Sequence, residues 1–212
     1  MAAAARLVVA TSNPGKLAEY RSMAGPSETI QLDLLPGFAS LPEFEETAPT
    51  FAENAAGKAL HYSRFTEDLL LAEDSGLVVP ALGGAPGPLS ARWAGPGASD
   101  ADRVRKLLDE MNGRPSGERE ARFVAVIALA RRGEMVAIFS DFVAGVLTRE
   151  PRGQDGFGYD PIFLFEPLGR TFAELTREEK NRYSHRGRAF RKVLAFLHPR
   201  ENGLLLDAAP PE

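Results

Sequence analysis

The chain has 212 residues, is 44% hydrophobic, and carries 25 basic against 29 acidic residues, which gives a net charge of −4. This length and apolar content suit one large domain or two closely packed lobes, and the acidic balance argues against a protein that coats nucleic acid. Because the sequence has no cysteine, disulfides, thiolate nucleophiles and zinc–cysteine sites are excluded.

The N-terminal apolar run at residues 7–10 is too short for the core of a signal peptide, and Asn13-Pro14-Gly15 interrupts it. No stretch approaches the roughly 20 apolar residues that a membrane helix requires. We therefore expect a cytoplasmic protein with no membrane partner and no stable nucleic-acid partner.

The N-terminal part of the chain predicts alternating strands and helices, from short apolar runs and from apolar residues at helical spacing. In chain order these are a strand at 7–10, a helix at 16–24, a strand at 30–34, a helix from 50 to about 65, and a strand at 69–72. The second helix begins with Thr50 and Glu53 at capping-box spacing.

The Gly- and Pro-rich stretch 82–97 predicts a loop, and residues 100–111 an amphipathic helix. Two β-rich runs at 123–130 and 135–146, separated by four polar residues, predict a hairpin. A last helix is predicted at 188–197, followed by a Pro-rich tail. Strands that alternate with helices and then form a hairpin indicate an α/β fold with a mixed sheet.

The turn after the first strand carries the first functional signal, Thr11-Ser12-Asn13-Pro14-Gly15-Lys16. A polar turn that begins a helix offers free amides, a helix N-terminus and a lysine, which together suit a phosphate group. It is not a Walker A loop, because the first glycine and the Lys-Ser/Thr pair are missing. The alternative is an ordinary turn with a surface lysine.

On the capped helix, Asn54, Lys58 and His61 fall at i, i+4 and i+7 and share a face. This face is either part of a site or a solvated edge, and both interpretations stay open. His61 is interpreted as a bystander, because the sequence suggests no partner for it.

Carboxylates form the second signal. Glu73 and Asp74 follow directly on the buried strand at 69–72, and Glu45-Glu46 lies in a loop that could meet them in space. Acids at the carboxyl end of a strand in an α/β sheet lie where ligands bind. Carboxylates without Cys or His suit Mg²⁺ or Mn²⁺. Glu45-Glu46 could also be a surface charge run, and Asp74 a turn-capping residue, but two acids at the end of an apolar strand favour function.

The third signal lies near the C-terminus, where Phe157-Gly158-Tyr159-Asp160 is followed by Lys180 and then His185-Arg186. Aromatic rings stack on flat groups and cationic donors bind oxygen acceptors, so the set favours a pocket for a heterocyclic base. Phe157 and Tyr159 could instead be core residues. With the phosphate-type turn and the carboxylates, the pattern indicates a nucleoside triphosphate site.

The sequence strongly resembles the inosine/xanthosine triphosphate pyrophosphatase family. The segments that carry this resemblance span almost the whole chain in family order: Thr11–Lys16, Thr50–Ala59, Glu73–Leu77, Ala81–Gly87 with Ser90–Arg92, Phe157–Phe163, Ala173–Leu175, Glu178–Asn181 and Ser184–Arg186. The resemblance implies a long twisted mixed β-sheet flanked by helices, in two lobes with a central cleft. It also implies a homodimer and a Mg²⁺-dependent conversion of a triphosphate to the monophosphate and pyrophosphate, with Mn²⁺ as a second candidate metal.

The resemblance also implies roles for individual residues. Asp74 is the expected catalytic base and, with Glu45, the expected metal ligand; Glu73 is a further candidate ligand, although many relatives carry Asp there. The residues expected to bind the purine nucleoside triphosphate are Thr11, Ser12, Asn13, Pro14, Gly15, Lys16, Asn54, Lys58, Ser75, Phe157, Gly158, Tyr159, Asp160, Lys180, His185 and Arg186. Ser12 stands where glycine is commoner.

The expected organisation is a single domain of two lobes over residues 1–198 with a tail at 199–212. The expected substrates are ITP, dITP, XTP and dXTP. Alternatives are a related pyrophosphatase of modified pyrimidine nucleotides, as in the Maf-like proteins, a plain phosphatase, and a non-catalytic nucleotide-binding regulator.

Overall fold

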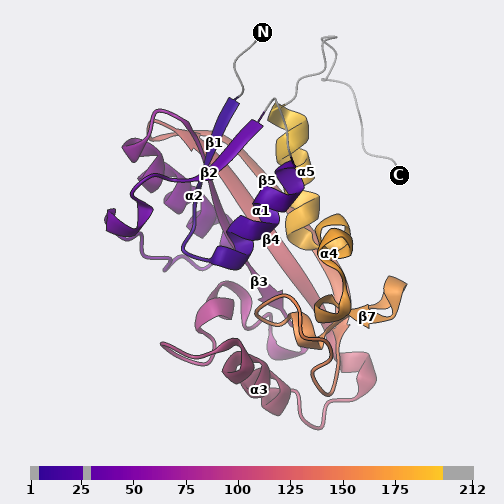
Figure 1. Cartoon of the computed structure of the whole chain (residues 1–212). Coiled ribbons are helices and arrows are strands. Elements are labelled where there is room, and N and C mark those ends of the chain that lie inside the picture. The colour runs from indigo at the N-terminus through magenta and orange to yellow at the C-terminus, as the bar shows by residue number, and fades with distance from the viewer. Residues whose placement is uncertain (1–4, 26–29, 198–212) are drawn as a thin grey trace, which may run out of the picture.

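A computed structural model describes residues 5–25 and 30–197 (Figure 1), so the predicted tail at 199–212 lies outside the described residues. The α/β prediction is confirmed: one mixed seven-stranded sheet has the order β2-β1-β3-β4-β5-β6-β7 and is flanked by helices. The elements are β1 (Ala5–Ala10), α1 (Pro14–Ala24), β2 (Ile30–Leu34), α2 (Phe51–Tyr62), β3 (Leu69–Val78), α3 (Asp100–Glu110), β4 (Glu120–Arg131), β5 (Glu134–Leu147), β6 (Phe163–Phe165), β7 (Arg170–Thr171), α4 (Arg177–Tyr183) and α5 (His185–Leu197).

β3 changes its pairing along its length, and this overturns one prediction. Its first part pairs in parallel with β1, which ends at Ala10 opposite Ala72. β3 then continues to Val78 because its antiparallel ladder with β4 continues. Glu73 and Asp74 therefore lie inside a strand, whereas the sequence predicted that the strand ended before them. They lie where the sheet loses β1, so the space beside them is open to loops.

β4 and β5 form the predicted hairpin, and it is longer and tighter than expected. Its turn has only Arg132 and Gly133 between the strands, with φ angles of 52° and 81°. Positive φ at both positions is typical of the type I′ turn that matches strand twist. The two strands run through the whole molecule (Figure 1) and join its two lobes.

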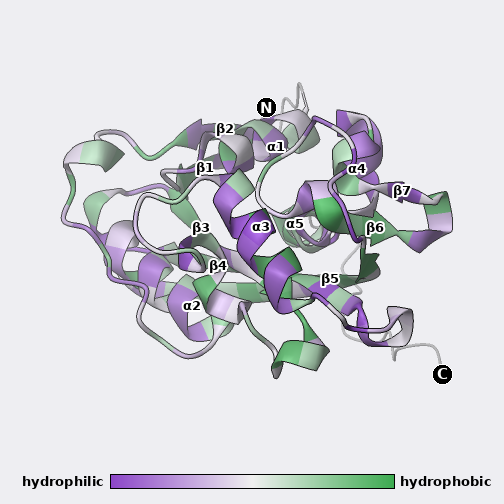
Figure 2. Ribbon diagram, turned by 90° about the horizontal axis from the view of Figure 1, so that it is seen from below, coloured by the Kyte–Doolittle hydropathy of each residue, from purple (hydrophilic) through white to green (hydrophobic). Residues whose placement is uncertain are grey.

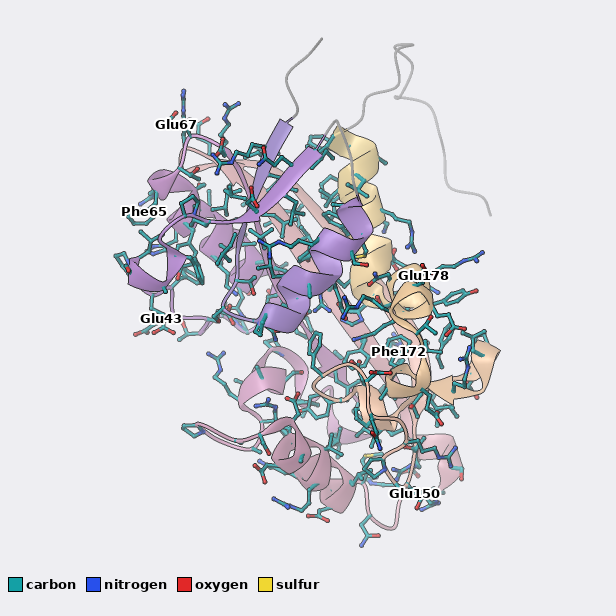
Figure 3. All side chains as sticks on the ribbon, viewed as in Figure 1. Glu43, Phe65, Glu67, Glu150, Phe172 and Glu178 are labelled. Carbon is teal, nitrogen blue, oxygen red and sulfur yellow. The ribbon has the colours of Figure 1, made fainter. Side chains whose placement is uncertain are left out.

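Three apolar clusters fill the two lobes. In the lobe that contains the N-terminal strands, α1 and α5 cover one face of the sheet and α2 covers the other. The other lobe has one cluster, in which α3 packs against β4, β6 and the segment around Phe172. Figure 3 shows Phe172 inside this lobe, with Glu43, Glu67, Glu150 and Glu178 at the periphery. α3 crosses the end of the molecule and carries a hydrophilic surface (Figure 2).

The segment predicted as a loop at 82–97 contains the 3-10 helix η4 (Gly87–Arg92), which packs on β3. Gly76 permits this contact, because a Cβ there would lie 2.7 Å from the carbonyl oxygen of Gly87. The last helix begins at His185, three residues earlier than predicted. Within the described ranges, every helix is too short or too polar to cross a membrane.

Candidate active site

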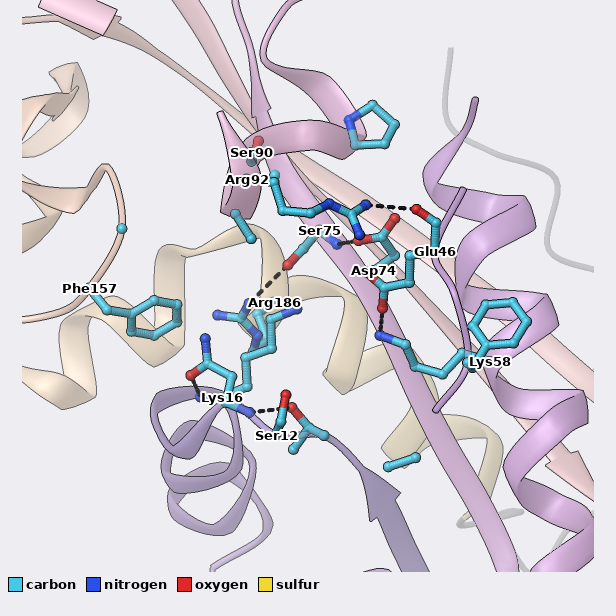
Figure 4. Close-up of a pocket in the computed structure, with 18 of the residues that line it drawn as sticks. Ser12, Lys16, Glu46, Lys58, Asp74, Ser75, Ser90, Arg92, Phe157 and Arg186 are labelled. Atoms are coloured by element: carbon cyan, nitrogen blue, oxygen red, sulfur yellow. Dashed lines mark hydrogen bonds and ion pairs between the residues drawn. The ribbon is translucent and has the colours of Figure 1, made fainter. Parts of the chain in front are cut away.

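A pocket of about 820 Å³ opens between the two lobes (Figure 4). It is large enough for a nucleotide-sized ligand. The structure brings most of the predicted site residues to its wall: Thr11, Ser12, Asn13, Lys16, Glu45, Lys58, Asp74, Ser75, Phe157, Gly158, Tyr159, Asp160, Lys180, His185 and Arg186. Pro14, Gly15, Asn54 and Glu73 do not line it. We call the part around Glu45, Glu46, Lys58 and Asp74 the α2 end, and the part around Phe157, Lys180, His185 and Arg186 the α5 end.

The turn before α1 is held by its own side chains. Thr11 Oγ1 accepts a hydrogen bond from the Asn13 amide at 3.1 Å, and Asn13 Oδ1 caps α1 by accepting from the Lys16 amide at 3.1 Å. The N-terminus of α1 thus borders the pocket, where it favours a negatively charged group. Lys16 Nζ lies 3.4 Å from Glu73 Oε1.

Asp74 is the central acid of the pocket and is only 5% exposed. Its Oδ2 accepts from Asn54 Nδ2 at 3.0 Å, and its Oδ1 accepts from the Ser75 amide at 2.9 Å. Burial raises the pKa of Asp74 above its usual value, although Asn54 and the nearby lysines oppose the shift. A fixed carboxylate with a raised pKa is suited to accept a proton.

Asn54 orients Asp74 from outside the pocket. Its amide group also bonds to Ala48 in both directions, donating to the carbonyl oxygen at 3.2 Å and accepting from the amide at 3.0 Å. Asn54 therefore joins the catalytic acid candidate to the loop at 41–50, which we call the acid loop because it carries Glu43, Glu45 and Glu46.

Lys58 connects α2 with the acid loop. Its ammonium group forms an ion pair with Glu46 and donates to the Glu73 carbonyl oxygen at 3.3 Å. Arg92 donates to the Glu46 carbonyl oxygen at 2.7 Å (Figure 4). Burial, with repulsion from Lys16, lowers the pKa of Lys58 to about 8. The sequence left open whether Glu46 joins the site or belongs to a surface charge run, and it gave Arg92 no individual role.

Glu73 points away from the pocket, as alternation along a strand requires beside Asp74. It accepts from Arg186 Nε and Nη2, both at 2.8 Å, and from the Tyr20 hydroxyl. Burial alone would raise the pKa of Glu73, but Arg186 and Lys16 hold it well below its usual value. Glu73 is thus a buried, ionised partner of Arg186.

Glu19, on α1, does not line the pocket but supports two residues that do, and the sequence did not predict it. It lies 2.5 Å from Arg186 Nη1 and 2.7 Å from Lys180 Nζ, so it joins α1 to both α4 and α5. Arg186 and Lys180 lower its pKa despite burial, which acts in the opposite direction. The available signal was spacing, since Glu19 lies three residues after Lys16 on the same helix face.

Phe157, Asp160 and Lys180 form a linked group at the α5 end. Lys180 pairs with Asp160 at 2.6 Å, and its ammonium group lies 4.5 Å from the centre of the Phe157 ring. Asp160 also accepts from the Phe157 amide at 2.8 Å. The Phe157 ring packs against Gly15, where a Cβ would lie 2.8 Å from the ring. Gly15 therefore provides space for the ring and is not itself part of the wall.

His185 is stacked on Phe123 with ring centres 4.8 Å apart and planes 8° apart. Burial, with repulsion from Arg186, holds the pKa of His185 well below its usual value, so the ring is neutral. Its Nδ1 is buried without a partner among the described residues. Tyr159 is a core residue whose hydroxyl donates to the Ser90 carbonyl oxygen at 3.0 Å, and the Gly158 amide donates to Asp100 at 2.7 Å.

The residues at the α2 end fit a hard metal ion. In the ranges that the structure describes, no three Asp, Glu, His or Cys side chains cluster as a complete ligand set. Glu45 and Asp74 nevertheless face the same pocket. Mg²⁺ commonly takes one or two carboxylates, with water and substrate phosphates completing its shell, so this oxygen-only pair suits it.

The sequence matches the model of the Ham1 family over residues 7–196. The chain belongs to this family. It is 47% identical over 192 residues to a dITP/XTP pyrophosphatase from Gloeobacter violaceus, which covers 89% of the chain and 92% of that protein. It is 42% identical over 191 residues to a dITP/XTP pyrophosphatase from Bacillus licheniformis, which covers 90% of the chain and 97% of that protein.

A solved structure of a HAM1 protein from Coxiella burnetii has the same fold, with a TM-score of 0.81 at 41% sequence identity. The match covers 91% of this chain and 98% of that one. The family resemblance inferred from the sequence motifs is confirmed.

Proposed function

We propose that the chain hydrolyses the nonstandard purine nucleoside triphosphates ITP, dITP, XTP and dXTP to the monophosphate and pyrophosphate. The observation that carries this proposal is a single pocket with two different ends. At one end hydrogen bonds orient the Asp74 carboxylate near Lys16 and Lys58. At the other end the Phe157 ring lies beside buried hydrogen-bond donors. The names of the relatives support the same substrates. Such an enzyme acts on the cytoplasmic nucleotide pool. We also propose that residues 1–198 act as one domain, because β4 and β5 pass through both lobes.

In the proposed reaction a water oxygen bonds to the α-phosphorus. The bond from this phosphorus to the bridging α,β-oxygen breaks, and pyrophosphate leaves with the electron pair. Asp74 takes the proton of the attacking water, and Lys16 and Lys58 stabilise the charge on the phosphate oxygens. Glu45 and Asp74 would hold Mg²⁺, or Mn²⁺ in its place, which when bound neutralises phosphate oxygens and lowers the pKa of water. Thr11, Ser12 and the N-terminus of α1 border the triphosphate.

The α5 end selects the base. Phe157 offers a ring face for stacking, and the donors of His185, Arg186 and Lys180 suit the carbonyl group that hypoxanthine and xanthine carry at position 6. Adenine carries an amino group there, which cannot accept a hydrogen bond from these donors. A site that hydrogen-bonds one group rejects an analogue without it by as much as ~10⁴-fold.

We also propose a homodimer that forms through β5. Val136, Ile138 and Phe142, which share one face of this strand, are 44%, 48% and 50% exposed. An apolar surface of this kind is typical of an interface between protein copies. Light scattering after gel filtration should give a dimer for the native chain and a monomer for Ile138→Lys. A native monomer at micromolar concentration would refute the proposal.

The decisive experiment incubates the protein with Mg²⁺ and ITP, dITP, XTP, GTP or ATP, and measures pyrophosphate and orthophosphate separately. Pyrophosphate from the first three, in excess over ATP, is expected; GTP, which carries the same carbonyl group at position 6, tests whether the 2-amino group of guanine is excluded. Orthophosphate as the only product would indicate a phosphatase, and turnover of modified pyrimidine nucleotides alone would indicate the Maf-like alternative. Binding without turnover would indicate a regulator.

A further inference from the structure

The acid loop is held on one face of α2 by contacts that the reaction does not use. The sequence left His61 without a partner, but its Nε2 lies 2.9 Å from the Pro42 carbonyl oxygen. The Tyr62 hydroxyl accepts from the Phe44 amide at 3.1 Å. With the two Asn54–Ala48 hydrogen bonds, this face carries the loop along nearly its whole length.

At the centre of this face the Phe44 ring lies over Gly57. A Cβ on Gly57 would lie 2.5 Å from Phe44 Cζ and 3.1 Å from Cε2, closer than carbon atoms approach without displacement. Gly57 has ordinary helical geometry, since its φ is not positive. A glycine inside a helix costs up to about 1 kcal/mol relative to alanine. Its absence of a side chain is therefore used for packing and not for backbone conformation.

Glu45 follows Phe44 directly in the chain and is exposed on the pocket wall. The ion pair between the acid loop and Lys58 is formed by Glu46 and not by Glu45. Glu45 is placed by its backbone, and consecutive Cα atoms are only 3.8 Å apart. A displacement of the Phe44 ring that moves its backbone therefore also moves the Glu45 carboxylate.

We infer that Phe44 and Gly57 form a packing lock that sets the position of Glu45, which makes both of them positioning residues for the metal-dependent reaction. This inference rests on the proposed function for its effect on turnover, but the lock itself is a structural property that can be tested without turnover. Groups that orient a metal ligand typically change metal affinity by 10- to 100-fold when they are altered.

The test is Gly57→Ala. The new methyl group displaces Phe44, while the helix gains alanine in place of glycine, so the thermal midpoint should stay the same or rise. The Mg²⁺ concentration for half-maximal pyrophosphate release from dITP should rise on the order of tenfold. Mn²⁺ binding measured by electron paramagnetic resonance in the presence of dIMP should weaken by a similar factor. Hydrogen exchange of the Phe44 and Ala48 amides should speed up.

Two further variants make the result specific. In Gly57→Ala with Phe44→Leu, the smaller side chain leaves space for the methyl group, so metal affinity and exchange should return toward native values. Gly117→Ala is the matched control, because a Cβ at Gly117 meets no atom within 4 Å and its φ is not positive. It should change neither the Mg²⁺ requirement, nor the Mn²⁺ affinity, nor the exchange of the loop amides.

Each outcome decides the inference. Unchanged exchange in Gly57→Ala would refute the lock, and faster exchange with unchanged Mg²⁺ and Mn²⁺ dependence would refute its positioning role. If the native chain releases no pyrophosphate, the proposed function fails; the exchange of the loop amides then decides the lock, and Mn²⁺ binding decides the positioning role.

Discussion

At the α5 end of the pocket, Glu19, Glu73, Asp160, Lys180 and Arg186 form a continuous set of buried ion pairs with partner distances of 2.5–2.8 Å. The α2 end is different. There Asp74 accepts only from neutral groups, its pKa is raised, and the pKa of Lys58 is lowered to about 8. The paired charges are suited to fix the shape of a binding surface. The raised pKa of Asp74 and the lowered pKa of Lys58 suit these two groups to exchange protons and to bind a charged substrate.

The largest effect is expected at the α2 end. Asp74→Asn removes the proposed proton acceptor, and general bases contribute about 10²- to 10⁴-fold to rate. The rate of pyrophosphate release should therefore fall by at least about 10²-fold. Because burial disfavours the Asp74 charge, the variant should not be less stable at pH 7, and urea unfolding checks this. Near-native turnover in this variant would show that Asp74 is not the proton acceptor and that the chemistry does not belong to the α2 end.

The next largest effect is expected at the α5 end, as lost stability. Glu73→Gln leaves the Arg186 charge without one of its partners, and a broken buried pair costs about 3–5 kcal/mol in unfolding free energy. Glu67→Gln is the matched control, because that glutamate is 77% exposed beside Arg132; it should unfold like the native chain. Equal stability of the two variants would show that the buried pairs do not stabilise this end.

Glu73 also provides a test through the pH dependence of stability. The pKa of Glu73 is depressed in the folded protein, so its stabilisation is present above the usual value of 4.5 and is lost as the pH falls through the folded value. The unfolding free energy of the native chain should therefore fall on acidification below pH 4.5. In Glu73→Gln the part due to this group should be missing.

A smaller effect is expected from Lys58. The ammonium group loses its charge as the pH rises through about 8, so kcat/KM should fall by up to tenfold per pH unit above this value. Lys58→Arg keeps its charge at high pH and should flatten this limb of the profile, even if its absolute rate is lower. If kcat/KM fell identically at high pH in both proteins, the fall would belong to a titrating group other than Lys58.

The smallest effect is expected from His61→Ala. This change removes one hydrogen bond from the acid loop and should cost about 1 kcal/mol in unfolding free energy, with a rise in the Mg²⁺ requirement below that of Gly57→Ala. A loss as large as that of Glu73→Gln would mean that the α2 end is held as firmly as the α5 end.

The sequence predicted local features well where they depend on neighbouring residues. The Thr50 hydroxyl caps α2 at the Glu53 amide, and the hairpin of β4 and β5 lies where the two β-rich runs placed it. Predictions that depend on distant partners were less successful. The end of β3 was wrong because its ladder with β4 outlasts the one with β1.

The site shows the same division. Most of the site residues that the motifs predicted line the pocket, including Lys16, Asp74 and Arg186, because their side-chain chemistry is visible in the sequence. Glu19 was missed because an acid inside a helix is usually exposed to solvent, and its two cationic partners lie more than 150 residues away. Gly57 was missed because its role depends on the Phe44 ring that lies over it.

The separation of paired residues along the chain has a consequence for synthesis. Glu73 lies in β3, next to β4, but the guanidinium group that neutralises it is 113 residues further along. A chain still leaving the ribosome would carry β3 and the whole β4–β5 hairpin while this carboxylate had only Lys16 and Tyr20 as partners. Burying it then is unfavourable, so the pocket closes only after α5 has been made. Acquisition of activity is therefore expected to require that α5 has left the ribosome.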